Sequence, residues 1–252
     1  MKTLFRTLGA IIALYACVAN VAAADSVRVA VAANFRAPML KLADAFSQTT
    51  GHVAQLSFGS TGKLAAQIRN GAPFEVLLAA DQQTPAQLET DDLAARGSRF
   101  TYAVGKLVLW SARDGFVDER GEVLRLAKFQ HLALANPRLA PYGAAAMQVL
   151  NNLGLLPQLQ PKLVYGESIA QAQQFVYSGN AELGMIAMSQ VTQDGALTAG
   201  SMWVIPSQLY EPVRQDMVIL AIGKDNPAAT ALAAYLKSDG AKAIIRAYGY
   251  EI

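Results

Sequence analysis

A hydroxyl-rich turn near the start of the chain has the clearest capacity for chemistry. Residues 59–62 read Gly-Ser-Thr-Gly, and the apolar residues Leu64, Ala65 and Ile68 follow at helical spacing. The first N–H groups of a helix have no intrahelical acceptor, and the helix dipole favours negative charge beside them. Such a turn can hold an anion. It can also be a plain Ser/Thr helix cap, which is the commoner role of this pattern.

The chain around this turn alternates between strands and helices, which favours an α/β fold with mostly parallel sheets flanked by helices. The chain enters a second α/β unit near residue 105 and returns with an apolar run at 217. We therefore expect one lobe made of residues 25–104 plus 217–252, and another made of residues 105–216. Strands are predicted at 27–32, 53–58, 74–80, 101–104, 106–110, 132–135, 163–166, 183–187 and 217–222. Helices are predicted to begin near residues 38, 64, 84, 144, 170, 228 and 241.

Each predicted lobe offers two breaks between a strand and a helix, at residues 33–34 and 59–61 in the first lobe and at 141–142 and 168–169 in the second. Ligands of such sheets lie beyond the carboxyl ends of the strands, and a cleft between lobes is a common place for a small ligand. The two breaks in the first lobe lie on the same side of its sheet, which favours anion binding over a plain cap. Asp81 ends a strand on that side, and because its carboxylate would repel an anion we expect it to cap the next helix or orient the loop.

The first 24 residues have the composition of an export signal. A basic start precedes the apolar run 8–14, and three alanines end at residue 24. The apolar run is too short to span a membrane. We expect cleavage after residue 24 and export to the periplasm. The segment ending at Cys17 resembles a lipoprotein box, but Tyr15 fits that box poorly, so lipid anchoring is the weaker alternative.

The composition argues against several other classes of protein. Residues 1–24 hold two basic and no acidic residues, so the 21 basic and 19 acidic residues of the whole chain become 19 of each after cleavage. A net charge of zero gives no reason to expect a nucleic-acid partner. The one cysteine leaves with the signal, and the chain has only His52 and His131, so we expect no protein-coordinated metal cation.

An exported hydrolase is the alternative from a different class. Ser60 is not part of a Gly-x-Ser-x-Gly motif, and neither histidine stands in a recognisable triad context. We therefore expect that the protein is not an enzyme and that it binds no cofactor. Among binding proteins, tungstate, sulfate and a small organic anion are alternative ligands. The aromatic residues Phe35, Tyr142 and Phe175 fit an organic pocket, but they fit core or rim packing at least as well.

Several short stretches, taken in order, are similar to one family. They are Val-Ala-Val-Ala-Ala-Asn-Phe at 29–35, Gly-Ser-Thr-Gly at 59–62, Asn-Gly-Ala-Pro at 70–73, Ala-Ala-Asp at 79–81, the run 98–110, Asn-Pro at 136–137, Ala-Pro-Tyr-Gly at 140–143 and Tyr-Gly-Tyr at 248–250. From residue 25 to residue 252 the chain resembles the periplasmic molybdate-binding proteins of ABC transporters. The resemblance implies a type II solute-binding protein whose two lobes close on a tetrahedral oxyanion and which serves a membrane permease. We expect it to be a monomer.

The resemblance also implies the ligand-binding positions, which are Ala33, Asn34, Thr61, Tyr142 and Ile169. At Tyr142 and Ile169 the family's contact is the backbone N–H, so the side chain matters less there. Some relatives place a tyrosine hydroxyl at the position of Ala187, and we expect the Asn34 side chain to replace that donor.

The chemistry of molybdate fits such a site. Molybdate is a dianion at neutral pH and needs only hydrogen-bond donors. A cage of N–H and hydroxyl groups without a carboxylate disfavours protonated phosphate, because the phosphate O–H would find no acceptor. Sulfate is smaller and cannot reach all the donors at about 2.7–3.2 Å at once. The sequence does not distinguish molybdate from tungstate.

Overall fold

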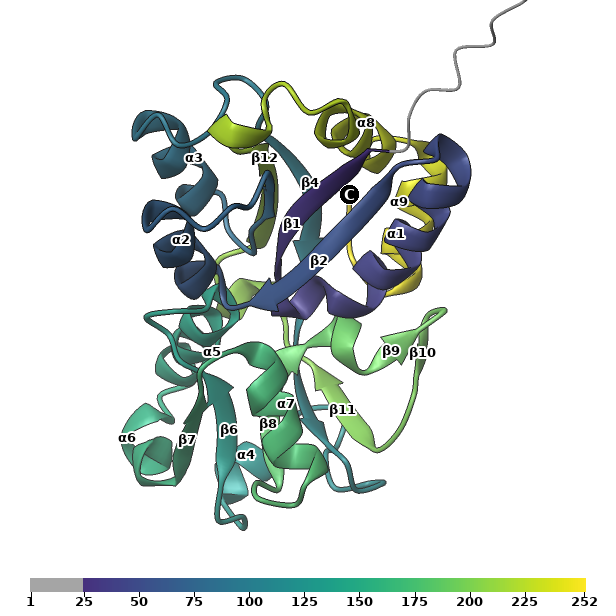
Figure 1. Ribbon diagram of the computed structural model, residues 1–252. Coiled ribbons are helices and arrows are strands. Elements are labelled where there is room, and N and C mark those ends of the chain that lie inside the picture. The colour runs from purple at the N-terminus through teal and green to yellow at the C-terminus, as the bar shows by residue number, and fades with distance from the viewer. Residues whose placement is uncertain (1–24) are drawn as a thin grey trace, which may run out of the picture.

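Two five-stranded sheets, each flanked by helices, form two lobes in the computed structural model of the chain, which describes residues 25–252 (Figure 1). The prediction of a two-lobed α/β fold is confirmed. Lobe 1 is the sheet with strand order β2-β1-β3-β12-β4 and its helices, and lobe 2 is the sheet with strand order β11-β5-β8-β6-β7 and its helices. The predicted signal peptide and Cys17 lie outside the described residues. Between residues 25 and 252 no helix has the length and apolar character needed to cross a membrane.

Lobe 1 takes its elements from both ends of the chain. Its strands are β1 (Ser26–Ala32), β2 (Val53–Gly59), β3 (Val76–Leu78), β4 (Phe100–Gly105) and β12 (Val213–Ile219). Its helices are α1 (Arg36–Thr50), α2 (Thr61–Arg69), α3 (Gln83–Thr90), α8 (Pro227–Leu236) and α9 (Asp239–Ala247), with the short 3-10 helices η1 (Ala33–Phe35) and η5 (Ala221–Gly223).

The alternation of side chains along β1 supplies both faces of the lobe 1 sheet. Val27, Val29 and Val31 lie in the core that the sheet shares with α1, α8 and α9, whereas Ala30 lies in the core shared with α2 and α3. All four residues are fully buried. Because helices cover both faces, β1 is apolar without interruption from Val29 to Ala32. This packing fixes the edge of the sheet where β1 and β2 end and where η1 and α2 begin.

Lobe 2 is built from the middle of the chain. Its strands are β5 (Leu107–Ser111), β6 (Leu132–Ala135), β7 (Leu163–Gly166), β8 (Leu183–Ala187) and β11 (Ser201–Val204), and a small hairpin joins β9 (Thr192–Gln193) to β10 (Ala196–Leu197). Its helices are α4 (Glu122–Leu126), α5 (Pro141–Asn152), α6 (Leu156–Leu159) and α7 (Ile169–Tyr177), with 3-10 helices η2 (Gln160–Lys162), η3 (Met188–Gln190) and η4 (Ser207–Leu209).

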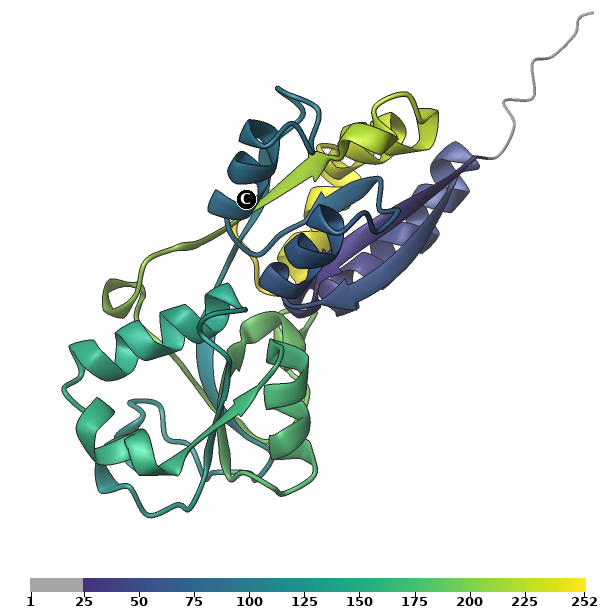
Figure 2. The same cartoon turned by 60° about the vertical axis from the view of Figure 1, so that its left-hand side comes forward.

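Two connections join the lobes: Lys106 lies between β4 and β5, and residues 205–212, which include η4, lie between β11 and β12 (Figure 2). Each delivers a strand that runs antiparallel to both neighbours: β5 against β8 and β11, and β12 against β3 and β4. Gly105 is the last residue of β4, directly before the first connection. A Cβ atom there would lie 1.8 Å from the Tyr142 hydroxyl oxygen, so the close approach requires glycine. Lobes joined by only two short connections are suited to hinge motion.

The return strand differs from the sequence prediction. β12 begins at Val213, four residues before the predicted start at 217. Its first half contains Gln215 and Asp216, which are almost completely buried and hydrogen-bonded to neighbouring side chains. The strand therefore starts without the apolar pattern by which a buried strand is recognised. The sequence analysis also missed β11, the β9–β10 hairpin and the short helices α4 and α6.

Candidate functional site

A small cavity lies where four helix starts from the two lobes meet. Ala33, Asn34 and Thr61 line it from η1 and α2 of lobe 1, and Tyr142 and Ile169 line it from α5 and α7 of lobe 2. None of these five residues is more than 7% exposed. The centre of a water molecule can occupy only about 10 Å³ of the cavity, so a ligand held there must be small. The structure thus brings all five predicted positions together, and their contact with a ligand remains a prediction.

The Asn34 side chain does not serve the role expected from the sequence. Its Nδ2 atom lies 2.8 Å from Gln215 Oε1 and 2.9 Å from Tyr250 Oη, so both amide hydrogens are donated within the protein. The expectation that this amide replaces a missing hydroxyl donor is therefore wrong in this structure. Asn34 is the second residue of η1, where the helix provides no acceptor for the backbone N–H. That N–H is the group of Asn34 that can serve an anion.

Thr61 is held so that its hydroxyl hydrogen can point toward the cavity. It is the first residue of α2 and is 1% exposed. Its Oγ1 atom accepts a hydrogen bond of 3.0 Å from the backbone N–H of Ala80, and the hydroxyl donates none within residues 25–252. An accepted bond fixes the oxygen and leaves the hydrogen for another acceptor. Thr61 can therefore offer both its hydroxyl and its backbone N–H.

The start of α5 leaves one backbone N–H free. Pro141 at the first helical position has no N–H, and the N–H of Gly143 donates to the Ala140 carbonyl at 2.9 Å. The Tyr142 N–H between them lies in the first turn and has no intrahelical acceptor. The Tyr142 hydroxyl instead accepts a 3.2 Å bond from Gln215 Nε2 of lobe 1. Burial, followed by the nearby phenols, raises the pKa of Tyr142 well above its ordinary value, so this hydroxyl stays neutral.

The start of α7 is capped by a side chain. Ser168 is the N-cap residue, and its Oγ atom accepts from the Gln171 N–H at 3.3 Å. Ile169 follows as the first helical residue, so its N–H has no intrahelical acceptor. Ala187, where some relatives were expected to carry a hydroxyl, is buried at the end of β8 and does not line the cavity.

Ser60 is a residue of this cavity that the sequence analysis did not select. It is the N-cap residue of α2, is 4% exposed, and lines the cavity beside Thr61. Its hydroxyl oxygen is buried without a hydrogen-bond partner in the protein. The motif at 59–62 does indicate Ser60 as a candidate, because it holds two adjacent hydroxyl residues. Spacing alone, however, does not tell which of the two faces a ligand.

The cavity has no charged side chain among the residues that line it. The partial positive charges of several helix starts therefore supply the potential that favours an anion. Asp81 follows the cavity residue Ala80, but its carboxylate accepts from the Thr84 N–H at 2.7 Å and from the Thr84 hydroxyl at 3.1 Å. This confirms that Asp81 caps the start of α3. Burial, reinforced by the nearby Asp216 carboxylate, raises the pKa of Asp81 despite those hydrogen bonds.

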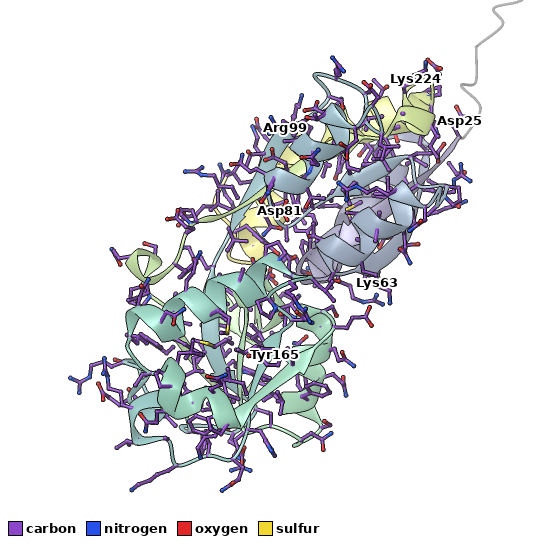
Figure 3. The ribbon with its side chains drawn as sticks, turned by 90° about the vertical axis from the view of Figure 1, so that its left-hand side faces the viewer. Asp25, Lys63, Asp81, Arg99, Tyr165 and Lys224 are labelled. Atoms are coloured by element: carbon purple, nitrogen blue, oxygen red, sulfur yellow. The ribbon has the colours of Figure 1, made fainter. Side chains whose placement is uncertain are left out.

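Contacts between the lobes surround the cavity. The Gly62 N–H of lobe 1 donates to the Leu139 carbonyl of lobe 2 at 2.9 Å. Ser189 of lobe 2 donates to the Asn34 carbonyl at 2.9 Å. Lys63 Nζ lies 2.5 Å from Glu167 Oε1 at the outer groove between α2 and α7, and Figure 3 shows Lys63 at the level where the lobes meet. These contacts join the two lobes around the cavity.

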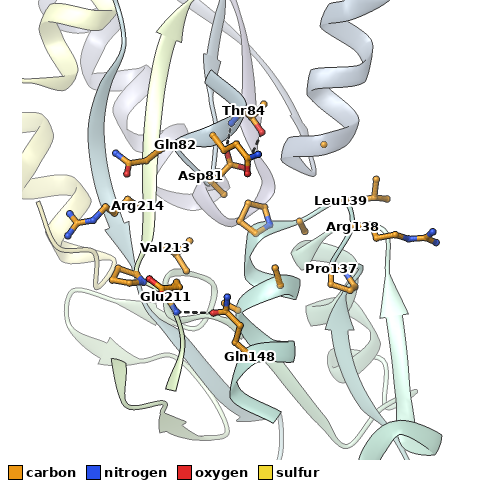
Figure 4. A pocket seen from close by; sticks show the side chains of 18 residues that line it. Asp81, Gln82, Thr84, Pro137, Arg138, Leu139, Gln148, Glu211, Val213 and Arg214 are labelled. Carbon is orange, nitrogen blue, oxygen red and sulfur yellow. Dashed lines mark hydrogen bonds between the residues drawn. The ribbon is translucent and has the colours of Figure 1, made fainter. Parts of the chain in front are cut away.

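A second, larger groove of about 600 Å³ also lies between the lobes (Figure 4). Its walls carry the carboxylates of Asp81 and Glu211 as well as the guanidinium groups of Arg138 and Arg214. Size alone would favour this groove as a ligand site. A small dianion needs converging donors and no nearby carboxylate, and the small cavity provides that arrangement.

Neither histidine lies at the cavity. The Nδ1 atom of His52 accepts from the backbone N–H of Asp25 at 3.3 Å, and His131 donates its backbone N–H to Glu182 at 2.9 Å. No Ser–His pair is therefore present among the residues that line the cavity.

Residues 27–251 match the family described as bacterial extracellular solute-binding proteins, and the chain belongs to that family. Its relatives include the molybdate-binding protein ModA of Azotobacter vinelandii, which is 60% identical over 237 residues covering 94% of this chain and 93% of that protein. ModA of Rhodobacter capsulatus is 47% identical over 229 residues, which cover 91% of this chain and 89% of that protein. A solved structure, the periplasmic molybdate-binding protein of A. vinelandii, matches with a TM-score of 0.87 and 43% identity over 90% of this chain and 99% of that one.

Proposed function

We propose that this protein binds molybdate in the cavity between its lobes and delivers it to the membrane permease of an ABC importer. The observation that carries this proposal is the convergence of four helix starts on a buried cavity without charged side chains. The relatives named molybdate-binding proteins support the choice of ligand. The protein is a binding protein and not an enzyme. It holds molybdate as a whole oxyanion, so no protein side chain needs to coordinate the molybdenum atom.

The donors that support this proposal come mainly from the backbone. They are the N–H groups of Ala33, Asn34, Thr61, Tyr142 and Ile169, together with the Thr61 hydroxyl. Rigid helix starts hold these donors at fixed separations, so an ion of the wrong size cannot reach all of them at hydrogen-bonding distance. Tungstate has the same charge and shape as molybdate, and we expect it to bind as well.

In this proposal the ligand bridges the lobes. In the structure lobe 1 comprises residues 25–105 and the segment from Val213 onward, and the chain crosses between the lobes at Lys106 and at residues 205–212. Release then requires the contacts around the cavity to break and the lobes to part. Small-angle scattering of the protein with and without saturating molybdate tests this, and we expect a more compact particle when the ligand is bound. Identical scattering profiles would contradict a hinge.

The same proposal places the protein outside the cytoplasm as a monomer that binds no nucleic acid. Cleavage of the signal would leave Asp25 at the N-terminus, which mass spectrometry of the exported protein would show. A diacylglycerol group on Cys17 would instead indicate a membrane-anchored lipoprotein.

Calorimetric titration of residues 25–252 with molybdate, tungstate, sulfate and phosphate tests the ligand assignment. We expect tight one-to-one binding of molybdate and tungstate, and weak or no binding of the other two ions. No heat with molybdate, or tighter binding of sulfate, would overturn the proposal.

A further inference from the structure

Ser60 has an unusual environment for a serine in a protein interior. Across residues 25–252 its hydroxyl oxygen is the one buried side-chain nitrogen or oxygen atom that has no hydrogen-bond partner in the protein. Buried polar groups are almost always paired, and leaving one unpaired is unfavourable. The residue lines the cavity that also contains Asn34, Thr61, Tyr142 and Ile169. The unpaired hydroxyl is therefore in a position to reach a ligand.

Other serines at helix starts make a capping hydrogen bond that Ser60 does not make. Ser168 and Ser238 are the N-cap residues of α7 and α9, and their Oγ atoms accept from the N–H groups of Gln171 at 3.3 Å and Ala241 at 3.2 Å. Ser60 occupies the same position at α2 with an extended backbone, φ −69° and ψ 147°, yet its side chain makes no capping bond. An N-cap serine ordinarily accepts from the second or third N–H of its helix. The Ser60 side chain therefore does not cap α2.

We propose that the Ser60 hydroxyl donates a hydrogen bond to the bound oxyanion and is a further affinity-determining residue of the site. This inference rests on the proposed function. The ligand oxygen supplies the acceptor that the hydroxyl lacks within the protein. Ser60 and Thr61 then present two adjacent hydroxyl donors from the start of one helix, next to the backbone N–H groups.

The proposal makes opposite predictions for the free and the bound protein. Replacing Ser60 by alanine removes an unpaired buried hydroxyl from the free protein, so its melting temperature stays equal or rises. In the complex the same change removes a donor to a charged ligand, which is enough to weaken binding about ten- to hundredfold. A capping role would give the reverse pattern, a lower melting temperature with unchanged affinity.

The experiment compares wild type with Ser60→Ala and with the control Ser238→Ala, all as residues 25–252. Ser238 caps a helix through its side chain and does not line the cavity. Melting temperatures are measured without ligand, and molybdate affinity is measured by calorimetry. For Ser60→Ala we expect a dissociation constant raised about ten- to hundredfold without a lower melting temperature. For Ser238→Ala we expect a lower melting temperature and unchanged affinity.

The outcomes separate this inference from the proposed function. Wild-type binding together with an unchanged affinity in Ser60→Ala would overturn the role of Ser60 and leave the molybdate site in place. A Ser60→Ala protein that melts at lower temperature yet binds as wild type would show that Ser60 is a cap. A wild-type protein that binds no molybdate would overturn both the function and the inference.

Discussion

Thr61→Ala tests the donor cage through two separate hydrogen bonds. In the complex the change removes the hydroxyl proposed to donate to the dianion, and hydrogen bonds to charged groups are worth about 1.5–3 kcal/mol. At about 1.4 kcal/mol per factor of ten, the molybdate dissociation constant should rise roughly ten- to hundredfold. In the free protein the change removes the acceptor of the Ala80 N–H, which is bonded to Thr61 Oγ1 at 3.0 Å. An unpaired buried N–H costs about 1–3 kcal/mol, and each kcal/mol lowers the melting temperature by roughly 2–4 °C in a protein of this size.

The measurement is calorimetric titration with molybdate, paired with thermal unfolding without ligand. Thr61→Ser is the matched control because it keeps the hydroxyl and loses only a methyl group, so we expect near-normal affinity. Unchanged affinity in Thr61→Ala would refute the reasoning. A Thr61→Ser protein as defective as Thr61→Ala would also refute it, since packing of the methyl group would then explain the effect.

Four further predictions follow from other features of the structure. Molybdate affinity should be nearly constant from about pH 6.5 to 9, because no carboxylate or imidazole lines the cavity and the raised pKa of Tyr142 keeps its phenol neutral. A pH-dependent step in calorimetric titrations across this range would contradict this prediction, because it would show that an ionisable group of the protein takes part in binding. Burial raises the pKa of Tyr250 to about 12, so stability from this phenol is complete below about pH 10 and is lost as the pH rises toward 12, which denaturation at several alkaline pH values would measure. Lys63→Ala should speed molybdate release by no more than about fivefold, because the side chains of the Lys63–Glu167 pair are both 51% exposed and such exposed pairs are worth about 0–1 kcal/mol. Stopped-flow measurement gives the release rates of wild type and variant, and a rate difference of equal size at low and high salt would argue against an ion-pair effect. Tyr142→Phe should lower the melting temperature by a few degrees, because it removes the acceptor of the 3.2 Å hydrogen bond from Gln215 Nε2, but it should change molybdate affinity less than about threefold. A large loss of affinity without a change in melting temperature would mean that the Tyr142 hydroxyl contacts the ligand.

Most of the fold was predictable because buried strands of α/β sheets carry continuous apolar sequences. β1, β6 and β8 begin and end within one residue of the ranges predicted from sequence. β12 was predicted too late because its first half holds Gln215 and Asp216, whose polar groups are satisfied only by partners distant in sequence. Asp216, for example, accepts from Arg99, Thr101 and Gln82. A strand whose polar residues are buried with such partners has no pattern that reveals it.

The positions of the candidate site were predictable from the strand-to-helix breaks and the family resemblance, but the roles of individual atoms were not. The Asn34 amide donates to Gln215 and Tyr250, which lie 181 and 216 residues away in the sequence. No local pattern shows that these two acceptors occupy the amide. The unpaired state of the Ser60 hydroxyl likewise depends on how the start of α2 packs beside lobe 2, where Gly62 donates to the Leu139 carbonyl. Sequence spacing therefore placed the donors at one cavity, whereas packing decides which of them are free.

The most direct test of the molybdate site is X-ray diffraction at the molybdenum absorption edge from crystals grown with molybdate. Molybdenum scatters anomalously at this edge, so its position can be found without assumptions about the site. We predict one strong anomalous peak in the small cavity, with molybdate oxygens at about 2.7–3.2 Å from the backbone nitrogens of Thr61, Tyr142 and Ile169 and from the Ser60 and Thr61 hydroxyl oxygens. A peak in the larger groove beside Asp81 and Arg214, or no ordered peak at saturating molybdate, would contradict the account.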